Sequence, residues 1–186
     1  MFPIPDPLHP AVVHFPIVFA MLLPLVALVT AWAIRRGTVA RQSWLLVVAL
    51  GAALLVSGWV AEQTGSREEE QVESVVSESA IHEHEEGAER FVLLAGATLI
   101  VLVVGMAPGA LGGAARGLGL AAALGLVAVG WQVGHSGGSL VYRDGAASAY
   151  AQPSGASAVG GGEEGNGERG RGGGGDEEGE GDDDDD

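Results

Sequence analysis

The sequence predicts an all-α protein: an integral membrane four-helix bundle followed by a disordered acidic C-terminal tail. Four apolar segments are each long enough to cross a bilayer, and four such segments in so short a chain favour a membrane bundle over buried soluble helices. The formal charge of −15 over 186 residues does not indicate a soluble protein, because the acids are confined to one loop and the C-terminus. We therefore expect a membrane domain over 1–150 and a Gly/Asp/Glu-rich tail over 151–186 that is too polar to fold.

Each predicted span has a recognisable end. The first is closed by Arg35 and Arg36, the second by Gly65, the third by Pro108-Gly109, and the fourth by the glycines after Ser136. No basic segment precedes the first apolar run, so we expect it to be a span and not a cleaved signal. The expected spans are residues 11–34, 43–61, 88–107 and 117–135.

The basic residues of the connecting loops predict the orientation. Arg35, Arg36 and Arg41 lie between the first and second spans, and Arg116 lies between the third and fourth, with no acid in either loop. By the positive-inside rule both loops are cytoplasmic. The sequence thus predicts a multi-pass protein of the inner membrane, with the N-terminus, the loop 62–87 and the tail outside, in the periplasm.

The charged loop 66–87 carries an apolar stripe that leads into the third span. Residues 72, 76, 80, 84 and 88 recur every four positions, so a helix here places His84 on its inward side. His82 lies about 200° away and is expected in solvent. We interpret the glutamates of this loop as a solubilising face. After the fourth span, residues 139–142 are expected to be extended and, with the turn at 143–145, to fold back over the bundle.

Polar residues that can bind a cofactor gather at the predicted outer ends of the spans. His14 is near the start of the first span, Glu62 ends the second, His84 leads into the third and His135 ends the fourth. A polar side chain at this depth needs a partner, and bundles build cofactor and metal sites from side chains on facing helices. The sequence thus predicts one candidate ligand from each helix around a common mouth.

Two chemistries fit these residues. Two of the imidazoles of His14, His84 and His135 can be the axial ligands of a b-type haem, while the same histidines with Glu62 or Glu85 can bind zinc, copper or iron. The absence of cysteine excludes covalently attached haem and thiolate-bound iron–sulfur clusters. No nucleophile–base arrangement or phosphate-binding glycine loop is present, so we name no catalytic residue and do not expect an enzyme.

Three segments resemble a bacterial membrane family catalogued as domain of unknown function 2231. They are Leu8-His9-Pro10 with Val13-His14-Phe15-Pro16, the pair His84-Glu85, and Gly134-His135-Ser136-Gly137-Gly138-Ser139-Leu140-Val141-Tyr142 with Gly145. The resemblance covers about residues 6–146 and leaves out the tail. It implies a four-helix membrane domain that in related proteins occurs beside cytochrome c or Rieske modules. It also implies that His9, His14, His84 and His135 are motif positions.

Three hypotheses follow for function. The first is a small membrane protein that binds one haem b near the outer face and exchanges electrons with a periplasmic cytochrome or Rieske-type protein. The second is a metal-binding membrane protein with a His/Glu site at the same mouth. The third is a structural subunit of a membrane complex whose polar residues only pack helices. In all three the lipid bilayer is the main partner, and no nucleic acid is expected.

Overall fold

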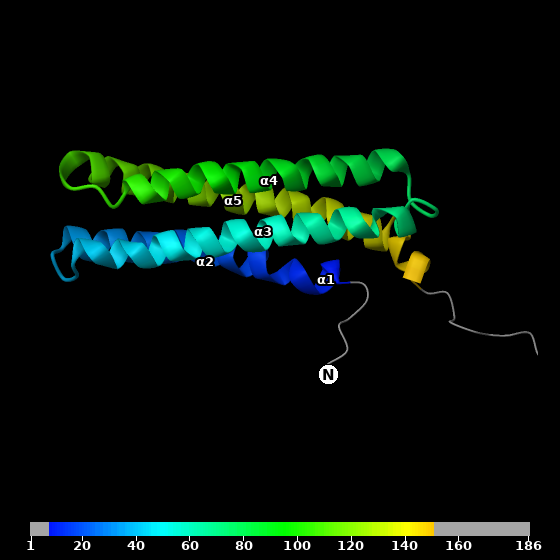
Figure 1. Ribbon diagram of the computed structural model, residues 1–186, viewed down its shortest axis with the longest axis horizontal. Coiled ribbons are helices and arrows are strands. Elements are labelled where there is room, and N and C mark those ends of the chain that lie inside the picture. Colours follow the sequence, from blue (N-terminus) through cyan, green and yellow to red (C-terminus); the bar gives the residue numbers. More distant parts are fainter. Residues whose placement is uncertain (1–7, 151–186) are drawn as a thin grey trace, which may run out of the picture. The chain divides into compact units, whose positions relative to one another are not determined.

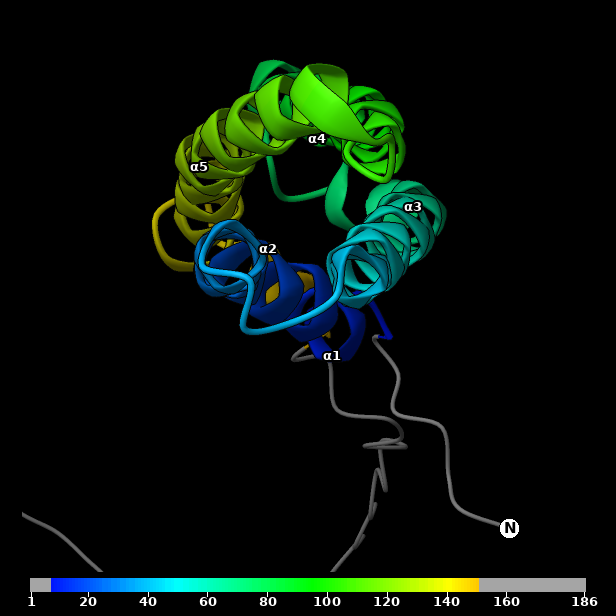
Figure 2. The ribbon, with the colours of Figure 1, turned by 90° about the vertical axis from the view of Figure 1, so that its left-hand side faces the viewer.

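The computed structural model describes residues 8–150, in which four long helices lie side by side in the order up, down, up, down (Figure 1). Seen end-on, they form a ring in which each packs against the next and the last returns to the first (Figure 2). The long helices are α2 (His14–Arg35), α3 (Leu45–Val72), α4 (Glu78–Val104) and α5 (Gly109–Tyr142). The short ones are α1 (His9–Val12), η1 (Arg41–Trp44) and η2 (Ala146–Tyr150).

All four long helices are long and apolar enough to cross a membrane, which confirms the predicted all-α membrane bundle. Their outward faces carry large apolar side chains that no other part of residues 8–150 covers, including Leu93, Ile100 and Leu118. Only lipid makes such a surface stable, because in water these side chains would be buried. The predicted acidic tail, residues 151–186, lies outside the described residues.

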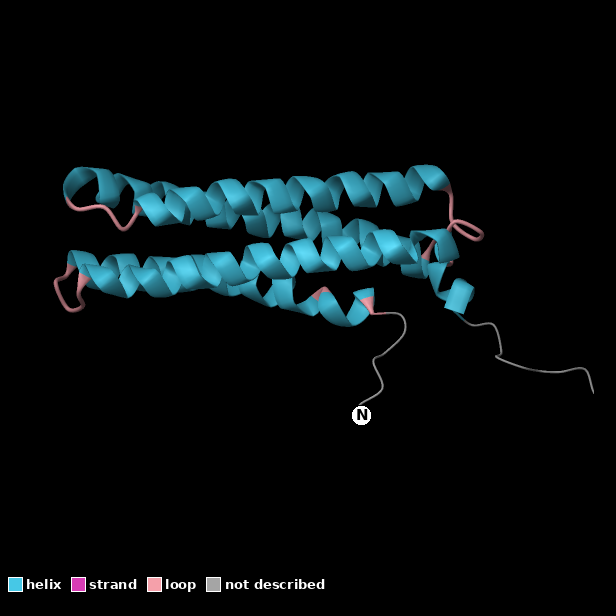
Figure 3. Ribbon diagram, viewed as in Figure 1, coloured by secondary structure: helices cyan, strands magenta, loops and turns pink. Residues whose placement is uncertain are grey.

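The helices extend beyond the predicted spans, and this changes the connections (Figure 3). The expected loop 66–87 is mostly the end of α3 and the start of α4, joined by a turn at 73–77. Residues 139–142 are the last turn of α5, so the expected extended piece is wrong. Leu140 packs there against Val76 and Ile81, and this tertiary contact outweighs the weak strand preference of Val141 and Tyr142.

The break between α1 and α2 lies at Val13, beside Pro16, where the sequence indicates a bend. Proline has no N–H, so the carbonyl of Val12 loses its usual helical partner. The carboxylate of Glu68 on α3 stabilises the start of α1: its Oε1 accepts hydrogen bonds from the backbone N–H groups of Leu8, at 2.7 Å, and His9, at 2.9 Å. A carboxylate at a helix N-terminus is favoured by the helix dipole. α1 is thereby fixed against α3.

The two ends of the bundle differ in chemistry. We call one the arginine end, because Arg35, Arg36, Arg41 and Arg116 lie there, and the other the histidine end, because all the histidines of the chain lie there. Arg116 is part of α5 and not of a loop, because α5 begins at Gly109. Its Nε donates to the carbonyl of Gly105 at 2.9 Å, and its guanidinium lies 5.8 Å from the ring centroid of Trp44.

The core between the helices is almost entirely apolar. Trp44 is fully buried, and its indole N–H donates to the carbonyl of Leu102 at 2.8 Å, so its polar atom is satisfied. The largest fully buried side chains are Trp44, Leu23, Leu54, Leu102, Leu126 and Val47. These side chains fill the interior between the two ends.

Gly112 and Gly113 give a matched test of this packing at the arginine end. A Cβ on Gly112 would overlap the carbonyl oxygen of Ala107, whereas a Cβ on Gly113 would meet nothing within 4 Å. Gly112→Ala should therefore lower the free energy of unfolding by about 1–3 kcal/mol. Gly113→Ala, which makes the same gain in helix propensity, should leave it unchanged or raised. Thermal unfolding in detergent measures both, and equal midpoints would contradict the packing.

Candidate functional site

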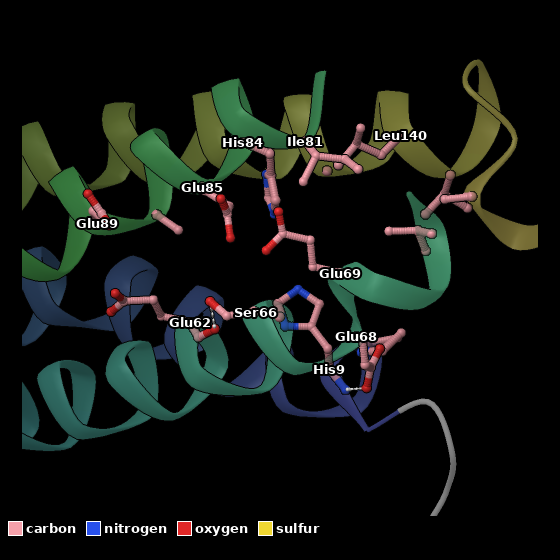
Figure 4. A pocket seen from close by; sticks show the side chains of 17 residues that line it. His9, Glu62, Ser66, Glu68, Glu69, Ile81, His84, Glu85, Glu89 and Leu140 are labelled. Atoms are coloured by element: carbon pink, nitrogen blue, oxygen red, sulfur yellow. Dashed lines mark hydrogen bonds between the residues drawn. The ribbon is translucent and has the colours of Figure 1, made fainter. Parts of the chain in front are cut away.

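A pocket of about 180 Å³ lies at the histidine end, between α1, α3, α4 and α5 (Figure 4). We call it the histidine pocket. Two imidazoles and five carboxyl groups line it, but none of the arginines among residues 8–150 does. The ionisable side chains in its wall are His9, His84, Glu62, Glu68, Glu69, Glu85 and Glu89. The site is therefore rich in carboxyl groups and has two imidazole rings that can act as nitrogen ligands.

His9 is held over α3 by its ring nitrogen Nδ1, which lies 2.8 Å from the carbonyl oxygen of Ala61 and 3.3 Å from Oγ1 of Thr64. A carbonyl only accepts, so Nδ1 carries the hydrogen, and in the neutral ring Nε2 has a free lone pair. The ring packs over Gly65, where a Cβ would lie 3.1 Å from its Cε1. The glycine thus makes room for the imidazole.

His84 is held in the same way by α5. Its Nδ1 lies 2.9 Å from Oγ of Ser136, and that hydroxyl donates its hydrogen to the carbonyl of Val133 at 3.0 Å. Because the hydroxyl hydrogen is already used, Nδ1 of His84 must be the donor, which leaves its Nε2 free as well. The ring lies against Gly137, where a Cβ would come within 2.9 Å of Cε1.

The two rings point toward one another across the pocket (Figure 4). Their centroids are 6.4 Å apart and their planes are nearly perpendicular, at 86°. Two metal–nitrogen bonds of about 2.0–2.1 Å, together with the radius of each ring, span about 6 Å between centroids. The spacing therefore matches two imidazoles that bind one metal centre from opposite sides.

The carboxyl groups of Glu69 and Glu85 reach into the space beside these rings, from α3 and α4 (Figure 4). They lie close enough to interact electrostatically. Glu62 and Glu89 line the pocket farther along the bundle axis. The interpretation of the loop glutamates as a solubilising face therefore does not hold for Glu68, Glu69 and Glu85, which line the pocket. His82 is in solvent as expected, 3.4 Å from Glu86.

The structure separates the histidines that the sequence placed together. His84 and Glu62 line the histidine pocket, while His14 and His135 are exposed and do not. Each is out of phase with the inward face of its helix: His14 is two residues from the buried Pro16, and His135 is one residue from Ser136, which contacts His84. Within residues 8–150 no three His, Asp or Glu side chains are placed to hold a metal ion without moving.

Two residues of the pocket were missed as candidate ligands, His9 and Glu69. The spacing of His9 is consistent with an inward position, since residues 9, 16 and 23 are seven apart and therefore share one helix face, on which Pro16 and Leu23 are buried. Nothing in the sequence distinguishes this face from the lipid-facing one, because both are apolar. For Glu69, the helix α3 had to be recognised as continuing past Gly65.

The open end of the pocket is partly covered by a small apolar cluster. Val76 from the turn, Ile81 from α4 and Ala146 from η2 are buried against one another, and Leu140 packs on them. The segment after α5 therefore does fold back over this end, through η2 in place of an extended piece. It shields the two imidazoles from bulk water on that side.

Comparison with known proteins adds one match. A family model described as predicted membrane protein (DUF2231) matches residues 5–149. No curated protein matches the chain. No solved structure matches it either. The matched range includes His9, His84 and every other residue that lines the histidine pocket.

Proposed function

The chain belongs to the family of predicted membrane proteins DUF2231, and from this premise we propose that it binds a divalent transition-metal cation in the histidine pocket. The protein ligands are Nε2 of His9 and of His84, joined by the carboxylates of Glu69 and Glu85. The observation that carries the proposal is the pair of facing imidazoles, each with its hydrogen fixed on Nδ1. Metal-binding histidines usually donate their other ring N–H in this way.

The charge of the pocket supports a cation as the ligand. Five carboxyl groups line the pocket together with the two imidazoles, and no arginine offsets them. Two facing carboxylates repel one another, and a cation between them removes this repulsion. Imidazole with carboxylate is a ligand set suited to zinc, iron, copper or manganese. The carboxyl groups of Glu69 and Glu85 turn toward the two nitrogens as the ion binds.

The apolar core supports binding at one membrane surface over transport through the bundle. Trp44, Leu54 and Leu102 fill the interior between the pocket and the arginine end. The four arginines at that end favour its placement on the cytoplasmic side of the inner membrane. The metal site then faces the periplasm, where it can exchange its ion, or electrons if the metal is redox-active, with soluble partners.

Haem b is the second candidate, and the ring geometry favours it specifically. Perpendicular imidazoles with centroids 6.4 Å apart suit the two axial positions of a haem iron, which needs no further protein ligand. Such a protein would exchange electrons with a periplasmic cytochrome or Rieske-type partner. The five carboxyl groups weigh against this candidate, because they repel the haem propionates. A cavity of about 180 Å³ also requires α3 and α4 to separate before a porphyrin enters.

The test uses the full chain, purified in a neutral detergent, stripped with a chelator, and titrated with Co²⁺ or Zn²⁺. We expect one ion per chain by elemental analysis, and visible absorption bands for Co²⁺ bound by nitrogen and oxygen. A Soret band in the protein as purified would replace this proposal by the haem candidate. A colourless chain that binds neither metal nor haem would contradict both and leave the structural-subunit hypothesis.

Ser136→Ala tests the hydrogen bond that positions His84. Without the hydroxyl, the His84 ring keeps only the backbone carbonyl of Val133 as an acceptor and its orientation is less fixed, so metal affinity should fall about tenfold to a hundredfold. Ser136→Thr keeps a hydroxyl and should restore most of the affinity. Ser139→Ala, three residues later on α5, is the matched control. Equal affinities for Ser136→Ala and Ser139→Ala, measured by Co²⁺ titration, would show that Ser136 has no such role.

A further inference from the structure

A second hollow, of about 500 Å³, lies beside α5 on the outside of the bundle, at the histidine end. It shares no lining residue with the histidine pocket. We call it the outer groove. It is lined by Ile17 of α2 and, on α5 and just after it, by Trp131, Gly134, His135, Gly138, Ser139, Tyr142 and Arg143.

The floor of the outer groove is made by two glycines four residues apart. A Cβ on Gly134 or Gly138 would meet no atom within 4 Å, so the space above both is open. Ile17 and Trp131 form apolar walls at the end nearer the bilayer centre, and Trp131 is 77% exposed. The open floor and apolar walls of this part of the groove suit an acyl chain.

The other end of the outer groove is polar and positively charged. His135, Ser139 and Arg143 follow one another at intervals of four residues, so they lie along one side of α5. Among residues 8–150, no ion pair or side-chain hydrogen bond is found for any of these three side chains. From Trp131 to Arg143 the groove runs along about 18 Å of helix. Arginine and tyrosine beyond an apolar stretch are typical of the headgroup level.

We propose that the outer groove binds one anionic phospholipid. An acyl chain lies on Gly134 and Gly138, and the headgroup phosphate accepts hydrogen bonds from Arg143, assisted by His135 and Ser139. The guanidinium suits phosphate because it donates two parallel hydrogen bonds. The change from apolar to cationic along one groove selects an amphiphile with a negative head, and not a soluble anion. This inference does not depend on the metal site.

The experiment uses the delipidated full chain in a zwitterionic detergent, with bound lipids counted by native mass spectrometry. We expect one phosphatidylglycerol per chain, bound at least about tenfold more tightly than phosphatidylcholine. Arg143→Gln should lower the affinity for phosphatidylglycerol about tenfold. Arg67→Gln, the same charge change on α3 at the same end, should leave it unchanged. Gly138→Leu fills the floor and should abolish retention.

Each contrary result overturns the lipid site. Equal affinities for the two lipids, or equal effects of Arg143→Gln and Arg67→Gln, would exclude recognition of the anionic headgroup. Full competition by glycerol phosphate would indicate a free-anion site in place of a lipid site. Unchanged retention in Gly138→Leu would exclude the groove, provided that the variant keeps the helical circular dichroism of the unaltered chain and is therefore folded. Failure of Co²⁺ binding in the unaltered chain concerns the histidine pocket alone.

Discussion

His84→Ala should abolish stoichiometric binding of Co²⁺ or Zn²⁺, lowering the affinity by more than about a hundredfold. Loss of a residue that only hydrogen-bonds to a metal ligand lowers metal affinity about tenfold to a hundredfold, so loss of the ligand itself should lower the affinity further. His9→Ala should have an effect of the same order, because the two imidazoles contribute equivalent nitrogens on opposite sides of the pocket. Titration of the chelator-stripped chain measures both affinities.

The chain supplies matched controls for this experiment. His14→Ala and His135→Ala remove the same side chain from exposed positions outside the histidine pocket, and both should bind metal like the unaltered protein. His82→Ala removes a solvated histidine of α4, two residues from His84, and should also be neutral. If His135→Ala lost the ion while His84→Ala kept it, the assignment of the ligands would be wrong.

Gly137→Ala should lower metal affinity about tenfold or more, although the substitution adds one methyl group and removes no ligand. Its Cβ would lie 2.9 Å from Cε1 of His84, a distance that real contacts do not allow, so the ring must shift from its position beside Ser136. Displacement of a ligand from a preorganised position costs affinity in the same way as loss of its partner. Co²⁺ titration again measures the effect.

Gly138→Ala is the matched control, since a Cβ there meets nothing within 4 Å and the change in helix propensity is the same. It should bind Co²⁺ normally. A spectroscopic measurement separates displacement from unfolding: Gly137→Ala should keep the helical circular dichroism of the unaltered chain. Normal affinity in Gly137→Ala would mean that His84 does not need its place against α5.

The contrast between adjacent residues of α5 also explains how one helix segment can carry two sites. Ser136 and Gly137 face His84 in the interior, while His135 and Gly138 line the outer groove. Successive helical residues are about 100° apart, so a short motif presents both faces. Because Gly137 and Gly138 have no side chains, other groups can approach the backbone of α5 closely on both faces. Gly137→Ala and Gly138→Leu should therefore affect metal binding and lipid binding separately.

The number of spans was predictable from the sequence, because a long apolar run in a bilayer must satisfy its backbone polar groups with its own helical hydrogen bonds. The inward placement of His84 was also predictable, since Ala80, His84 and Ala88 follow one another at four-residue intervals on α4, although the first two positions of the predicted stripe, Val72 and Val76, lie at the end of α3 and in the turn. In the spans themselves the apolar pattern is continuous. It could not show that His9 faces the interior and His14 faces away.

By itself the sequence determined that this protein is a membrane bundle with its histidines at one end and Arg35, Arg36, Arg41 and Arg116 at the other. Length, hydropathy and charge are properties of each segment, so they need no knowledge of the neighbours. Only the tertiary structure decided which side chains meet. Lipid and protein interior are equally apolar, and rotation of each helix is therefore set by packing against its neighbours: Gly65 under His9, and Gly137 and Ser136 against His84.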